Sequence, residues 1–217
     1  RHTHRPHVGR AIKLTSAGAY EWSERVAGPG DDAALAVAAV RGGGFVVGGS
    51  FEQQADVIAN RVRLVSAGAS DGYIVGISAA GNTAWGSRIG GVHADAVRGV
   101  ADASLLENGS LEQRFVVVGN VGGDASYAKG GAVPIDAMEA AGGIDSFVMA
   151  ITGAASLVWS RTLDSPANDA ALGVAADPTG GIVVIGRADG VLLPNQVFNG
   201  ASADDPSAGI EAARAAG

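Results

Sequence analysis

The sequence predicts an all-β protein assembled from three repeated units of four short strands. Val- and Ile-rich runs of about five to eight residues alternate with turns of Gly, Asn, Asp and Ser. The same order of runs then recurs along the chain. Glycine supplies 34 of the 217 residues, more than twice its usual share, which suits a protein with many tight turns.

Three tryptophans give the repeat its period. Trp22, Trp85 and Trp159 are 63 and 74 residues apart, and an aspartate follows each of them ten residues later. These aspartates are Asp32, Asp95 and Asp169. A glycine closes each unit, in the segments FVVGG, FVVVGN and IVVIGR, and the alignment places Gly48, Gly119 and Gly186 in register. These columns predict positions that maintain the fold.

The columns divide a single repeat domain, residues 1–217, into units and connectors. The units cover about 8–50, 71–120 and 145–187, and the connectors are 51–70, 121–144 and 188–210. The second connector is rich in Gly and Ala and has no clear period. Gly209-Ile210-Glu211 resembles Gly143-Ile144-Asp145, so residues 211–217 are interpreted either as the start of a fourth unit or as a short terminal helix.

The first turn of each unit precedes its tryptophan. Gly18 and Gly81 lie four residues before the tryptophan, where a hairpin favours positive φ. The third unit has Ala155 at this place and Gly153 earlier, so we expect its turn to be shifted. The middle unit is the longest, and we expect its extra residues, Leu105 to Arg114, to form a hairpin extension. Asn108, in the only N-glycosylation sequon, falls at the tip.

Units of this size cannot each bury a face alone, so we expect them to pack side by side as blades. The predicted fold is therefore β-propeller-like, with three four-stranded blades. A closed propeller usually has about four to eight blades. Either further blades in a longer chain or neighbouring subunits would then complete the ring, or the blades would stack openly. Open strand edges readily pair with other chains, so we expect assembly into a larger object.

The repeat resembles the SBBP-type β-propeller repeat, through DxFVxxI, a Gly turn, the Trp, DxAxGVAxD and the VVxG strand. The similarity covers most of Val8 to Gly186 and departs from the pattern at Val8, at Ala155 and around Asn108. The resemblance implies propeller blades and an extracellular or cell-surface setting. It carries over no catalytic residue, and it assigns the Trp and Asp columns a structural role.

The bulk composition excludes several classes of function. A net charge of -7 without a basic patch argues against binding to nucleic acid or to an anionic membrane surface. The absence of cysteine excludes disulfides and thiolate chemistry. No apolar run approaches the roughly 18 residues of a membrane span. Arg1 is not an initiator Met and no signal peptide follows it, so we expect a processed chain or a piece of a longer one.

Few residues suggest chemistry. The histidines His2, His4 and His7 lack a carboxylate or Cys partner nearby in sequence, and His93 lies in a turn without a nucleophile signature. Acidic turn positions offer hard oxygens for Ca²⁺ but lack the spacing of known calcium loops. They are Asp31, Asp32, Asp124, Asp204 and Asp205. The Gly-rich segments 42–44 and 122–123 match no phosphate-binding motif and are interpreted as turns.

The sequence thus predicts no catalytic, cofactor-binding or metal-binding residue. The leading hypothesis is a non-enzymatic scaffold or protein-interaction module in an extracellular or cell-surface assembly, with protein partners or further copies of the same object. The alternative is a propeller domain that binds carbohydrate or a Ca²⁺-dependent ligand through loops on the rigid scaffold. A propeller hydrolase or lyase is the third hypothesis.

Overall fold

The computed structural model describes residues 6–57, 62–107, 109–129, 135–139, 143–163, 167–177 and 179–189. Every regular element in these ranges is a β-strand, and each strand pairs antiparallel with its neighbours. The predicted all-β class is confirmed. Within the same ranges, no helix is long and apolar enough to cross a bilayer. Residues 211–217, where a fourth unit or a helix was predicted, lie outside the described residues.

The strands follow one another with short turns between most of them. Their bounds are β1 (Gly9–Leu14), β2 (Tyr20–Ala27), β3 (Ala33–Ala39), β4 (Phe45–Val57), β5 (Val62–Ile77), β6 (Thr83–Gly90), β7 (Ala96–Asp102), β8 (Leu105–Glu107), β9 (Ser110–Glu112), β10 (Arg114–Val121), β11 (Ala125–Lys129), β12 (Ile135–Met138), β13 (Asp145–Thr152), β14 (Leu157–Leu163), β15 (Asp169–Ala176) and β16 (Ile182–Ala188).

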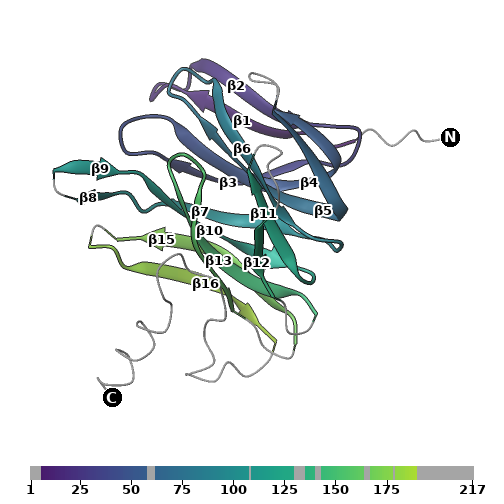
Figure 1. Ribbon diagram of the computed structural model, residues 1–217. Helices are drawn as coiled ribbons and strands as arrows, with labels where there is room; N and C mark the ends of the chain where they lie inside the picture. Colours follow the sequence, from purple (N-terminus) through teal and green to yellow (C-terminus); the bar gives the residue numbers. More distant parts are fainter. Residues whose placement is uncertain are drawn as a thin grey trace, which may run out of the picture.

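Most of the described strands stack as two four-stranded layers, here the first and the second layer, between two two-stranded half-layers, from β1–β2 at the top of Figure 1 to β15–β16 at the bottom. In the first layer, β3, β4, β5 and β6 pair in that order, and in the second layer the order is β7, β10, β13 and β14. The pair β1–β2 is the N-terminal half-layer, and β15–β16 is the C-terminal half-layer. Strand β7 packs beside both β3 and β15, so the leading strands of successive layers lie next to one another.

The layers are offset by two strands from the repeat units of the sequence. Unit 8–50 supplies β1 to β4, but β1–β2 packs against the face of the first layer and joins its sheet only at the far end of β4, through Val26↔Val57 and Ala27↔Asp56. The reason is the pairing of β4 with β5, which runs from Phe45↔Ile77 to Val57↔Val62 with one register shift between Glu52 and Gln54 and joins the end of one unit to the start of the next. Each four-stranded layer therefore begins at a repeat aspartate and combines two strands from each of two units.

The connectors contain strands rather than irregular loops. Strands β4 and β5 extend through most of connector 51–70, and the far end of β4 turns back to pair Val57 with Val26 of β2. The second connector forms β11 and β12, and β11 pairs with β6 from Ser126↔Gly90 to Lys129↔Ser87. Each connector thus pairs with the last strand of the preceding layer, the first connector with β2 and the second connector with β6. In this way each connector attaches that strand to the next layer.

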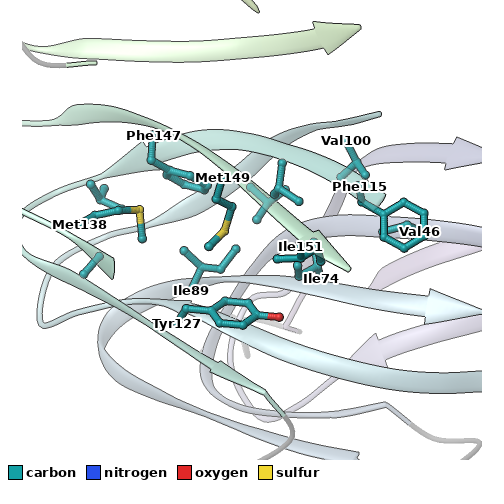
Figure 2. Close-up of a cluster of buried hydrophobic side chains, with 14 residues drawn as sticks. Val46, Ile74, Ile89, Val100, Phe115, Tyr127, Met138, Phe147, Met149 and Ile151 are labelled. Carbon is teal, nitrogen blue, oxygen red and sulfur yellow. The ribbon is translucent and has the colours of Figure 1, made fainter. Parts of the chain in front are cut away.

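A large apolar core lies between the first and second layers. Figure 2 shows side chains from the facing surfaces of both layers meeting there, with Ile74 opposite Ile151 and Phe147 beside Met149. Because the first layer is covered on both faces, all seven residues from Asp71 to Ile77 are buried on alternate sides. The FVVGG run of β4, the FVVVG run of β10 and the YIVGI run of β5 are therefore largely buried strands, covered on both faces.

The third hairpin turn is not shifted, contrary to the prediction. The amides of Gly18, Gly81 and Ala155 donate to the third residue before each of them, at 2.9, 2.9 and 2.8 Å. Their φ angles are 79°, 86° and 59°, so Ala155 takes the same left-handed position as the two glycines. A left-handed non-glycine residue costs about 1–2 kcal/mol, a penalty that the surrounding buried structure sustains.

The predicted hairpin extension of the middle unit is present. Strands β8 and β9 pair through Leu105↔Glu112 and Leu106↔Leu111, and Gly109 has a φ of 79° beside the tip. Asn108, the predicted glycosylation position, lies outside the described residues.

Candidate functional site

The repeat aspartates are buried at the junctions between layers. Asp32, Asp95 and Asp169 are each at most 3% exposed, and each stands at the start of the first strand of a layer. The amide of each one donates to a carbonyl at the edge of the preceding layer. The acceptors are His7, Ser70 and Ile144, at 3.2, 2.8 and 2.6 Å. The Asp column therefore ties every layer to the one before it.

The carboxylates of this column also accept backbone hydrogen bonds. Asp95 Oδ2 accepts from Gly91 at 2.7 Å and Oδ1 accepts from Gly122 at 2.9 Å, while Asp32 Oδ2 accepts from Gly28 at 2.6 Å. Burial raises the pKa of both Asp32 and Asp95 to about 6, although these hydrogen bonds oppose the rise. A raised carboxyl pKa can mark a catalytic acid, but here both Asp95 oxygens and Asp32 Oδ2 accept backbone hydrogen bonds.

A buried ion pair lies next to Asp95. Asp71 is fully buried, and Arg88 donates to its Oδ2 at 2.7 Å. The same guanidinium donates to the Gly90 carbonyl at 3.1 Å and to Ser126 Oγ at 2.8 Å. Arg88 thus links β5, β6 and β11, which attaches the second connector to the first layer.

The tryptophan column fills the space between layers. Trp22 meets Phe45 of the following layer edge-on, with ring centroids 5.7 Å apart. Trp85 meets Phe115 of the next layer in a tilted arrangement, with ring centroids 6.3 Å apart and ring planes inclined at 35°. Trp159 packs against the core between the second layer and the C-terminal half-layer. The ring of each tryptophan is therefore a wedge between one layer and the next.

The glycine column requires a correction, because Gly49 rather than Gly48 matches Gly119 and Gly186. Gly49, Gly119 and Gly186 each pair with the residue two positions after a repeat aspartate, just before a β-bulge. A Cβ on these glycines would lie 1.8, 2.0 and 2.3 Å from the carbonyl oxygens of Ala33, Ala96 and Ala170. Gly48 instead faces the Val97 side chain. The close approach of a backbone carbonyl therefore explains the column.

The chemistry candidates do not converge on a common site. His93 is exposed, and His7 contacts Asp31 through Nδ1 at 3.2 Å. Among the described residues, no group of three His, Cys, Asp or Glu side chains could hold a metal ion. Asp124 and the segments 42–44 and 122–123 lie in turns or bends between strands. His2, His4, Asp204 and Asp205 lie outside the described residues.

The two half-layers expose the apolar side chains that the complete layers bury. Val183 and Ile185 of β16 are 62% and 65% exposed, whereas their counterparts in β10, Val116 and Val118, are 1% and 0% exposed. Ile12 and Leu14 of β1 are likewise exposed, although their counterparts in β5 and β13 are buried. Sequence reasoning missed these positions because the repeat columns show which residues correspond, not which layers are incomplete.

A pocket of about 170 Å³ lies between the second layer and the C-terminal half-layer. Leu163, Asp169 and Gly186 contribute to its wall. In the complete layers an aromatic ring covers the matching glycine: Tyr73 lies against Gly49, and Phe147 lies against Gly119. The pocket therefore marks the place that a side chain from a third strand would fill.

No protein-family model matches this sequence, and a search of curated proteins finds no match.

Proposed function

We propose that the protein is a non-enzymatic, β-propeller-like scaffold or interaction module of an extracellular or cell-surface assembly. One observation carries the proposal: both ends of the stack are half-layers with open strand edges and exposed apolar side chains. Strand β1 pairs only with β2, and β16 pairs only with β15, among the described residues. Such edges and faces are association surfaces.

The repeat columns support a structural rather than chemical use of the residue types that recur in them. The buried aspartates bind backbone amides, the tryptophans separate layers, and Arg88 neutralises a buried carboxylate. The resemblance of the repeats to SBBP-type propeller repeats supports both the propeller-like interpretation and the surface location.

Replacement of exposed apolar residues tests the proposal. Val183→Ser/Ile185→Ser removes apolar surface from the open face of β16 without touching the buried cores. Sedimentation equilibrium should show concentration-dependent association of the wild-type chain and a shift toward monomer in the variant. A wild-type chain that stays monomeric at every concentration, and whose mass the variant leaves unchanged, would refute a role in assembly. Ala39→Ser, on the exposed end of β3, is a control that should leave association unchanged.

A further inference from the structure

The two half-layers of this chain are complementary parts of one layer. Strands β15 and β16 correspond to the first and second strands of the complete layers, since they share the bulge and the glycine of β3–β4 and β7–β10. Strands β1 and β2 correspond to the third and fourth strands, since they share the turn and the tryptophan of β5–β6 and β13–β14. Among the described residues, the C-terminal half-layer therefore lacks a third and a fourth strand, and the N-terminal half-layer lacks a first and a second strand.

We propose that a second copy of this chain completes the open layer head to tail, with its β1 pairing antiparallel with β16. This inference rests on the proposed function, since it names the partner in the assembly. A strand added to an open edge gains main-chain hydrogen bonds along its length.

The complete layers fix the register of this pairing. Gly49 pairs with Tyr73 and Gly119 pairs with Phe147 at the equivalent position. By the same spacing, Gly186 pairs with Arg10 of the second copy, and Val183 pairs with its Lys13. Ile12 and Leu14 of the second copy then face the second layer, where Trp159 lies, as Val75 and Ile77 face Trp22.

The charges at the junction favour Arg10 of the second copy as the residue that fills the pocket beside Asp169. In the first layer the Tyr73 ring crosses Gly49 toward Asp32, whose charge is one cause that raises the pKa of Tyr73, after burial. Arg10 stands at the Tyr73 position of the N-terminal half-layer and is exposed. Across the junction its guanidinium would enter the pocket beside Asp169, where a cation meets a carboxylate.

Closure also favours two copies. Each copy has two complete layers, so a head-to-tail pair would close as six layers, four complete ones and two shared ones. This number lies within the range of about four to eight for closed propellers. Closure of one copy on itself would give three layers, below that range.

Disulfide cross-linking tests the register, because the chain has no cysteine of its own. Val183→Cys and Lys13→Cys chains, mixed and oxidised, should form a disulfide-linked dimer of twice 21.4 kDa. Glu21→Cys replaces Lys13→Cys as the matched control, since it breaks the same Lys13–Glu21 ion pair but lies on β2, one strand further from β16. The control mixture should remain unlinked.

Charge reversal tests the pocket contact in the chain without cysteines. Arg10→Glu should raise the dissociation constant of the dimer about 10- to 100-fold. Arg98→Glu, an exposed reversal on the complete second layer, should change it less than about twofold. Equal effects of the two reversals would overturn the Arg10–Asp169 contact.

The outcomes separate this inference from the proposed function. An oligomer that cross-links through Val183→Cys alone, tail to tail, would overturn the head-to-tail pairing and leave a scaffold role intact. A mass that keeps rising with concentration would overturn the two-copy ring. A chain that is monomeric at all concentrations, with β16 covered by another segment of the same polypeptide, would overturn both.

Discussion

Single residues set the spacing of the layers where backbones approach most closely. Gly49, Gly119 and Gly186 leave no room for a Cβ, and an aromatic ring lies against the first two. The sequence repeat predicts a glycine column. In the first unit, however, the segment FVVGG contains two adjacent glycines, Gly48 and Gly49, and the sequence alone placed Gly48 in the column. Only the pairing with the strand after Asp32 distinguishes them.

Gly119→Ala should therefore destabilise the protein strongly. The new methyl group would meet the Ala96 carbonyl at 2.0 Å, so the backbone must move, at a cost of about 3 kcal/mol, the upper end of the usual range for overpacking. Gly18→Ala is the control: its φ is 79° but its Cβ would meet open space, so we expect about 1 kcal/mol. Chemical denaturation measures both. Equal losses would show that close packing is not the reason for the glycine.

The raised pKa of Asp95 predicts how the free energy of unfolding changes with pH. Because the folded pKa is about 6 and the ordinary value is 3.8, the fold favours the protonated carboxyl. This stabilisation is present below about pH 4 and is lost as the pH rises through 6, by roughly 1–3 kcal/mol. Asp95→Asn should make that fall in the pH profile of the free energy of unfolding smaller, and the part that remains should come from Asp32, whose pKa is also raised to about 6.

Asp56→Asn serves as the control for this pH profile. Asp56 is exposed and its hydrogen bond with Arg63 lowers its pKa, so its loss should leave the fall between pH 4 and 6 in place. Parallel profiles for the wild type and Asp95→Asn would contradict the assignment to Asp95.

At the scale of strands, the repeat predicted the elements well and their grouping poorly. Alternating Val-rich runs and turn residues identify β1 to β7, β10 and β13 to β16, because local pattern determines a strand. The offset between units and layers depends on which strands pair across long connectors, which a repeat pattern does not encode. Strands β11 and β12 showed no clear hydrophobic period in the sequence, because they are short and Gly- and Ala-rich segments flank them.

The connectors attach successive layers, and Arg88 makes the most buried of these attachments. Arg88→Met leaves the Asp71 carboxylate buried without its cation, so we expect a loss of about 3–5 kcal/mol in unfolding free energy. Arg63→Met breaks the exposed pair with Asp56 and should cost far less, because water screens exposed ion pairs. Urea denaturation of both variants measures the difference. A similar small loss for each would mean that the buried pair contributes little.

At the scale of the whole molecule, the described residues form two complete layers flanked by two half-layers. The sequence predicted an unclosed arrangement from its blade count, and that prediction rested on three whole units. The half-layers change the interpretation: the open ends are the first half and the second half of the same layer. The exposure of Val183, Ile185 and Ile12 follows from this arrangement, because no strand among the described residues lies where strands cover their counterparts in the complete layers.

Hydrogen exchange of the β16 backbone tests the central claim, that the open edge of the C-terminal half-layer is an association surface. The outward-facing amides of β16 should exchange rapidly in dilute protein and become protected at concentrations above the dissociation constant. Amides of β10, which pairs on both sides, should be protected throughout. Exchange in β16 that is slow at every concentration, or fast at every concentration, would contradict the claim.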